Sequence, residues 1–238
     1  MRIGRVSMLC LGLVHGLLAP GLATEVMPWL TPTSIGGANL EVYYANSTQE
    51  VKLDIGYKVP CDYVSERVNL KCTFRPALGL ELCGLVGIMC AELKNGKPSF
   101  KGQMDGTVFG GGIRYVLLGD IIILPVVSFE LGLSHSSASL IEEDSTKILE
   151  LENTKLQGSV MVGKKIGIVT PYGGVKFFHD WVRWKDESKG DKGKGTGGDI
   201  SPFLGGKIAF NPFLSIKGEI SFGDEFNYAG GLSLSIGL

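Results

Sequence analysis

Few residues of this sequence have the chemistry that catalysis or metal binding requires. Of its three histidines, only His135 and His179 follow the apolar N-terminal stretch. Histidine beside a carboxylate or a hydroxyl is a common proton-transfer pair, so His179-Asp180 is the best catalytic candidate and Ser134-His135-Ser136 the second. Adjacent residues of an extended strand point to opposite faces, and both sets lie in such stretches. We therefore predict no catalytic residue, and a hydrolytic site around His179 stays as an alternative.

The first 23 residues have the form of an export signal. Arg2 and Arg5 provide a basic start, Val6 to Leu18 is apolar, and Gly21-Leu22-Ala23 is a small-residue cleavage site. We expect residues 1–23 to be removed and residues 24–238 to form one domain. The 23 Lys and Arg nearly balance the 24 Asp and Glu. Because this balance gives no strong positive field, we do not expect a nucleic-acid partner.

Four cysteines remain after the signal, and disulfides persist in exported proteins. We expect Cys61 to pair with Cys72, because both could lie near the ends of adjoining strands. Cys83 and Cys90 are seven residues apart and would face opposite sides of one strand. The sequence has no Cys-x-x-Cys motif and almost no histidine, so we predict no metal and no cofactor.

Alternation of apolar and polar residues dominates the mature chain. From Leu214 to Phe222, apolar residues or glycine alternate with Ser215, Lys217, Glu219 and Ser221. No stretch after the signal has the roughly 18 consecutive apolar residues of a helical span. Alternating stretches of about 9 to 11 residues match a tilted strand that crosses a bilayer. The sequence therefore predicts an all-β fold, a closed antiparallel up-and-down transmembrane β-barrel.

Eleven stretches qualify as strands, and we predict a barrel of 8 to 12 strands with ten as the best number. Bacterial single-chain barrels have even strand numbers, so we place Asn39 to Ala45 outside the wall. The ten wall strands are then Val51 to Val59, Val68 to Phe74, Leu78 to Cys90, Thr107 to Leu118, Ile121 to His135, Leu156 to Val162, Pro171 to Trp184, Phe203 to Phe210, Leu214 to Phe222 and Tyr228 to Leu238.

The connections between these strands alternate in length. Glu92 to Gln103, Ser136 to Thr146 and Lys185 to Asp199 are long and polar, whereas Gly119-Asp120, Gly163 to Gly167 and Asn211-Pro212 are tight turns. In an up-and-down barrel, every second connection lies at the same end. We therefore expect long loops outside the cell and short turns in the periplasm. The glycine-rich, mixed-charge tract Lys185 to Asp199 is expected to be a flexible loop.

One face of most strands carries charge, and this face must be the lumen if the apolar face meets lipid. A Lys or Arg near the bilayer midplane on the lipid side costs about 2 to 4 kcal/mol. We expect these charges to pair within a narrow barrel and to form a salt-bridged plug. The predicted lumen residues are Glu81, Arg114, Glu130, Lys176, Lys207, Lys217 and Glu219.

The C-terminal run PFLGGKIAFNPFLSIKGEISFGDEFNYAGGLSLSIGL resembles the closing hairpins of the OmpA/OmpX-like outer-membrane β-barrel superfamily. There, too, an asparagine-proline turn precedes an alternating strand and a glycine-rich strand ends the barrel. The resemblance implies a bacterial outer-membrane location, reached by export through the Sec pathway, with membrane lipid as a partner. Small barrels with histidine and carboxylate sites at the outer rim include proteases and lipid A deacylases.

We expect an integral outer-membrane protein with a structural or surface-interaction role, whose long loops contact a surface ligand or a host or cell partner. Three alternatives stay open: a narrow pore for small solutes, a hydrolase with a rim site, and a soluble periplasmic β-sandwich that binds a ligand.

Overall fold

The structure is a computed structural model that describes residues 36–54, 58–94, 100–102, 106–118, 125–142, 148–186, 190–223 and 225–236. The expected signal of residues 1–23 lies outside these residues. All the regular elements that the structure describes are strands: β1 Ala38–Asp54, β2 Lys58–Ala77, β3 Leu80–Lys94, β4 Phe100–Gly102, β5 Gly106–Leu118, β6 Val126–Glu142, β7 Ile148–Gly163, β8 Val169–Asp186, β9 Lys192–Ala209, β10 Leu214–Ser221 and β11 Glu225–Ile236. Within the described part of the chain, no helix is long and apolar enough to cross a membrane.

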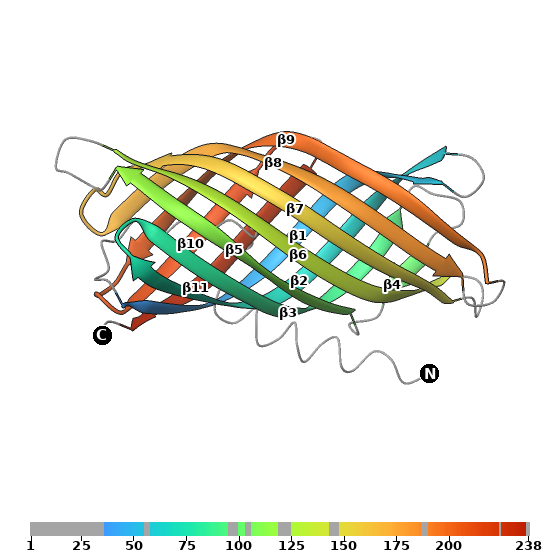
Figure 1. Cartoon of the computed structure of the whole chain (residues 1–238), viewed down its shortest axis with the longest axis horizontal. Coiled ribbons are helices and arrows are strands. Elements are labelled where there is room, and N and C mark those ends of the chain that lie inside the picture. The colour runs from blue at the N-terminus through green and yellow to red at the C-terminus, as the bar shows by residue number, and fades with distance from the viewer. Residues whose placement is uncertain are drawn as a thin grey trace.

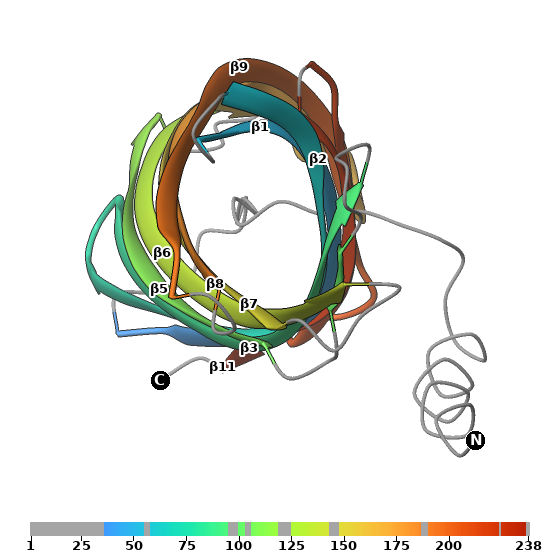
Figure 2. The same ribbon diagram turned by 90° about the vertical axis from the view of Figure 1, so that its right-hand side faces the viewer.

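The strands form one closed antiparallel ring (Figures 1 and 2). Each strand pairs with its neighbours in sequence, and β1 closes the ring by pairing with β11. The short β4 and the longer β5 both pair with β3 and β6, so together they form one wall strand. The wall therefore has ten strands, which confirms the predicted fold class and best strand number and excludes a β-sandwich.

The beginning of the wall differs from the prediction. Asn39 to Ala45 does not lie outside the barrel, because β1 runs without a break from Ala38 to Asp54. The predicted strand Val51 to Val59 is also wrong, since β1 ends at Asp54 and β2 begins at Lys58. The predicted strand Val68 to Phe74 lies within β2, which is longer at both ends. Asn46, Ser47 and Thr48 are residue types that favour turns, but pairing with β2 and β11 on both sides keeps this stretch extended.

We call the two ends of the barrel the turn end and the loop end. At the turn end, β7 and β8 are joined through 164–168 and β9 and β10 through 210–213, as predicted. Asn211 shapes the second of these turns, since its Oδ1 accepts hydrogen bonds from the backbone N–H groups of Phe213 (2.9 Å) and Leu214 (2.8 Å). The predicted turn Gly119-Asp120 lies outside the described residues.

At the loop end, two of the predicted long polar loops, Ser136 to Thr146 and Lys185 to Asp199, are wrong, whereas residues 95–99 and 103 of the third, Glu92 to Gln103, lie outside the described residues. β6 continues to Glu142, β8 to Asp186, and β9 begins at Lys192. Most of the polar tracts Ser136 to Thr146 and Lys185 to Asp199 therefore belong to paired strands. In the sequence these tracts resemble loops, because the residues on both faces depart from the alternation expected of a strand that faces lipid.

The barrel narrows toward the loop end. β10 has eight residues and β11 has twelve, whereas β1, β8 and β9 have 17 or 18. Beyond the β10–β11 hairpin, β9 pairs directly with β1 through Lys52↔Thr196 and Leu53↔Gly195. The wall thus has ten strands near the turn end and eight near the loop end. Eight strands leave an interior just wide enough for side chains to fill.

Close packing between strands inside the barrel depends on glycine at a few positions. Tyr172 on β8 lies opposite Gly205 on β9, and a Cβ at Gly205 would meet the tyrosine ring at 2.4 Å. With this space free, the Tyr172 hydroxyl reaches β10 and donates a hydrogen bond of 3.2 Å to the carbonyl of Gly218. Glycine therefore lets an aromatic ring lie across the neighbouring strand.

Candidate functional site

In the half of the barrel near the turn end, most inward side chains are polar, apart from a small buried cluster of Val126, Met161, Tyr172 and Phe203, and the outer face is apolar. On β3, for example, Glu81 is buried, whereas Leu82 and Val86 on the other face are 43% and 56% exposed. The same division holds around the ring. All seven charged residues expected in the lumen lie buried at inward positions, namely Glu81, Arg114, Glu130, Lys176, Lys207, Lys217 and Glu219.

Three of these residues belong to a buried ionic chain across β2, β3, β5 and β6. Arg114 Nη1 lies 2.7 Å from Glu81 Oε2, and its Nη2 lies 2.8 Å from Glu130 Oε2. The sequence did not identify the two residues that extend the chain at its ends: Arg75 pairs with Glu81, and Lys71 Nζ lies 3.2 Å from Glu130 Oε1. Each carboxylate therefore bridges two cations.

The other four residues lie on the opposite wall. Lys217 Nζ is 2.9 Å from Oε2 of Glu41, which lies on β1, and Lys176 Nζ is 3.9 Å from Oε1 of Glu219. Lys207 on β9 lies directly opposite Lys217 on β10. Lys217 and Lys176 are therefore each paired with a carboxylate within the barrel.

A third polar group lies closer to the loop end, around the fully buried Asp180. Its carboxylate accepts hydrogen bonds from Gln49 Nε2 (3.1 Å) and Asn153 Nδ2 (2.8 Å), and Lys155 Nζ lies 4.0 Å away. Lys155 also lies over the ring of Phe178, 4.3 Å from its centroid. Asp180 thus links β8 to β7 and, across the interior, to β1.

Neither candidate catalytic set forms a site. His179 points outward and packs edge-on against Trp181 at a centroid distance of 4.6 Å, while Asp180 points inward. His135 also lies on the outer face and hydrogen-bonds through Nδ1 to Thr154 Oγ1 (3.0 Å), whereas Ser134 and Ser136 face the interior. Within the residues that the structure describes, no group of three or more His, Cys, Asp or Glu could hold a metal ion.

The expected disulfide between Cys61 and Cys72 is also wrong. Both cysteines lie on β2 rather than on adjoining strands. Eleven residues of extended chain span about 36 Å, far beyond the Cα separation of about 4.4 to 6.8 Å that a disulfide allows. Cys72 is a free thiol on the outer face.

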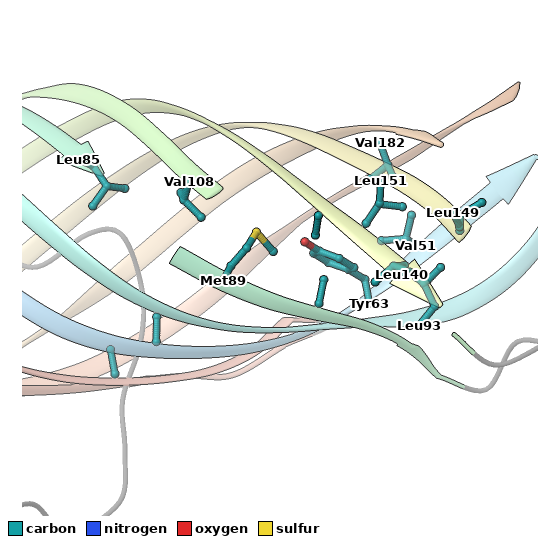
Figure 3. Packing of buried hydrophobic residues seen from close by; sticks show 14 of the residues in the cluster. Val51, Tyr63, Leu85, Met89, Leu93, Val108, Leu140, Leu149, Leu151 and Val182 are labelled. Atoms are coloured by element: carbon teal, nitrogen blue, oxygen red, sulfur yellow. The ribbon is translucent and has the colours of Figure 1, made fainter. Parts of the chain in front are cut away.

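Toward the loop end, the interior changes from polar to apolar. Buried side chains from β1, β2, β3, β6, β7 and β8 pack together there, as Figure 3 shows, with Trp184 against them. Leu140 and Ala91 are completely buried. We call the part of this cluster nearest the loop end the apolar cap. Its residues are Val51, Tyr63, Leu93, Leu140, Leu149, Leu151 and Val182.

The outer face changes in the opposite sense at the same level. On β7, Val160 and Leu156 point outward toward the turn end, whereas Glu152 and Glu150 do so toward the loop end, followed by Ile148 at the strand's beginning. Aromatic side chains lie where the outer face changes from apolar to polar. Phe109 and His135, for example, are in contact there, with their ring centroids 5.1 Å apart. One barrel therefore has an apolar outside and a polar inside in one half, and a polar outside and an apolar inside in the other.

This inversion is the pattern expected of a wall that crosses from lipid into water. In lipid, apolar side chains belong on the outside; in water, they belong in the core. Sequence reasoning expected the outer face of each strand to stay apolar along its whole length, so it missed the apolar cap. It missed Glu41 because Asn39 to Ala45 was placed outside the wall, and it left Lys71, Arg75, Lys155 and Asp180 out of the lumen set. Continuing the period of two through Arg75 and Lys71 on β2 would have found two of them.

A cavity of about 30 Å³ lies beside the first ionic chain, lined by Lys71, Cys83, Gly112, Glu130 and Ser134 among others. By this measure it has room for about two water molecules.

No protein-family model and no curated protein matches the sequence. Among solved structures, the β domain of the Bordetella autotransporter Brka is similar at 12% identity, covering 84% of this chain and 100% of that chain, with a TM-score of 0.48. The translocator domain of the autotransporter NalP from Neisseria meningitidis shares 11% identity over 88% and 91% of the two chains, with a TM-score of 0.47. The outer membrane protein OprG from Pseudomonas aeruginosa shares 11% over 87% and 98%, with a TM-score of 0.40. All three are β-barrel or outer-membrane proteins, and none is OmpA or OmpX; the fold assignment rests on the strand pairing.

Proposed function

We propose that this chain is an integral protein of the bacterial outer membrane with a closed interior and a structural or surface-interaction role. The observation that supports it is the inversion of both faces at one level of the barrel. The ten-stranded half has the outward apolar face of a membrane wall, and the eight-stranded half has the outward polar face of a protein in water. The loop end then faces outside the cell, and residues 1–23 serve as the export signal.

Closure follows from what fills the barrel. Ion pairs occupy the interior within the membrane, and the apolar cap, with Leu140 and Leu151 almost completely buried, occupies it above. An ion that crosses would have to displace both the paired charges and a dehydrated apolar layer, which is costly. The barrel therefore acts as an anchored platform rather than as a pore.

We propose no catalytic role for the rim. A proton-transfer pair needs both groups within hydrogen-bond reach of one substrate, and His179 and Asp180 lie on opposite faces of the wall. The surface that remains for interaction is the outward polar face of the eight-stranded half, together with the connections at its tip.

Two measurements test this proposal. The mature chain, folded in detergent, should migrate faster on a gel before boiling than after, as closed barrels do, and should aggregate without detergent. In planar bilayers it should give no steady conductance, whereas a variant lacking the apolar cap, Leu140→Ser with Leu151→Ser, should give brief openings. Steady conductance by the wild-type chain would replace this proposal with a narrow pore, and solubility without detergent would refute the membrane location.

A further inference from the structure

Four cations form a square on the outer face of β8 and β9 near the loop end. Arg183 lies directly opposite Lys194, and Lys185 directly opposite Lys192, in two consecutive outward pairs of the ladder. We call these four residues the cationic square. Facing pairs of antiparallel strands bring Cβ atoms within about 4.5 to 5.5 Å of each other. This arrangement was not predicted from the sequence, because the lysines fall in the tract expected to be a flexible loop.

Such pairing is unfavourable in the absence of an anion. Like charges directly opposite each other destabilise a sheet. Lys185 is compensated, because its Nζ lies 3.0 Å from Glu150 Oε2 on β7. Glu152 lies opposite Arg183 in the register but forms no ion pair with it. Within the described residues, Arg183, Lys192 and Lys194 have no carboxylate at ion-pair distance, so positive charge accumulates on this face.

The position of the cationic square identifies the source of the anion. Going from the turn end to the loop end, the outward pairs of the same ladder are Phe177 with Ile200, His179 with Gly198, and Trp181 with Thr196, followed by the two cationic pairs. Successive outward pairs lie about 7 Å apart along the strands. The cations therefore begin one step above Trp181, a residue type that marks the interface between lipid and water. Their side chains point outward from the barrel wall, in the plane of the membrane, rather than away from the membrane at the loop end.

We propose that the cationic square binds phosphate groups of the phosphorylated glycolipid, lipopolysaccharide, that surrounds the barrel in the outer leaflet. A guanidinium binds phosphate through two parallel hydrogen bonds, and the neighbouring ammonium groups add point charges. A lipid phosphate reaches a sideways-facing surface at the height of the head groups without any reorientation of the barrel. This inference rests on the proposed outer-membrane location.

The test measures, by titration calorimetry, the binding of purified lipopolysaccharide to the folded mature chain in zwitterionic detergent. The variant Arg183→Glu with Lys194→Glu should bind about tenfold more weakly or worse, with a smaller dependence on salt. The matched control, Lys164→Glu with Lys165→Glu, makes the same change of charge at the turn end and should bind within about twofold of wild type. Equal affinity of wild type and the Arg183/Lys194 variant would overturn the inference.

Two further titrations identify the chemistry. Enzymatically dephosphorylated lipopolysaccharide should bind wild type as weakly as the Arg183/Lys194 variant binds the intact lipid; undiminished binding would overturn a phosphate site. Heparin represents a soluble polyanion, and tighter binding of heparin than of lipopolysaccharide at the cationic square would overturn the lipid assignment. Heat-dependent gel migration of each variant checks the barrel separately, so a failure of the proposed membrane fold is distinct from a failure of lipid binding.

Discussion

Arg114 and Glu130 lie directly opposite each other on β5 and β6, and the guanidinium donates from both Nε (2.9 Å) and Nη2 (2.8 Å) to the same carboxylate oxygen. Both side chains are buried. The pair is the centre of an ionic chain that joins four strands of the wall. Its two members therefore do not contribute independently to stability.

Replacing one member of this pair should destabilise the barrel more than replacing both. We expect Glu130→Leu to lower the free energy of unfolding by about 3 to 5 kcal/mol, because it leaves buried cations uncompensated. The double variant Arg114→Met with Glu130→Leu should lose less. Urea unfolding in detergent, followed by tryptophan fluorescence, measures both. A double variant that is less stable than the single one would contradict the proposed coupling.

The apolar cap should respond to truncation as a protein core does. Leu140→Ala should cost about 2 to 5 kcal/mol, since the side chain is completely buried. Leu131 lies on the same strand but is 49% exposed on the outer face. Leu131→Ala is the matched control and should change stability in detergent much less. The same unfolding measurement compares them, and equal losses would argue against a packed cap.

Two adjacent glycines on β9 should differ sharply in their tolerance of alanine. A Cβ at Gly205 would overlap the Tyr172 ring, whereas a Cβ at Gly206 has no heavy atom within 4 Å. We expect Gly205→Ala to cost about 1 to 3 kcal/mol through overpacking. Gly206→Ala should be neutral or slightly stabilising. Thermal midpoints read from heat-dependent gel migration would show the difference, and identical midpoints would refute the packing described.

The boundary between the two halves can be located by labelling whole cells with a membrane-impermeant maleimide. Glu152 and Val160 both point outward from β7, on opposite sides of the boundary. Glu152→Cys should be labelled and Val160→Cys should not, because the second position faces lipid. The parent chain gives the background from its native cysteines. Labelling at neither position would mean that the loop end does not face outside the cell, and labelling of Val160→Cys would contradict its contact with lipid.

Cys72 should react as a thiol in the folded protein. The oxidised and reduced chains should migrate identically on a gel, and Cys72→Ser should leave stability unchanged within about 0.5 kcal/mol, as for surface positions. A mobility shift that reductant abolishes, and that disappears in the Cys72→Ser variant, would show that Cys72 forms a disulfide.

The sequence predicted the fold class and the number of wall strands, because alternation with a period of two is a local signal. It placed Glu81, Arg114 and Glu130 on the inward face for the same reason. The beginning of β1 could not be recognised: Asn46, Ser47 and Thr48 favour turns locally, and only pairing with β2 and β11 keeps them extended.

The loop end was misread for a different physical reason. A stretch such as Lys192 to Gly198 has few apolar residues on either face, so by composition it cannot form a core. In the barrel its glycines fit against larger neighbours, as Gly193 does against the Trp184 ring. The apolar contribution comes from β7 and β8. When the neighbouring strands provide the core side chains, a prediction that considers one segment at a time does not recognise the strand.

The narrowing from ten strands to eight has a thermal consequence. Unfolding the apolar cap exposes apolar surface to water and therefore raises the heat capacity, which makes that half lose stability on cooling as well as on heating. In the proposed membrane location, the outward apolar face of the other half contacts hydrocarbon, so its stability should depend on the surrounding lipid instead. We therefore expect the two halves of one continuous ring to respond differently to temperature.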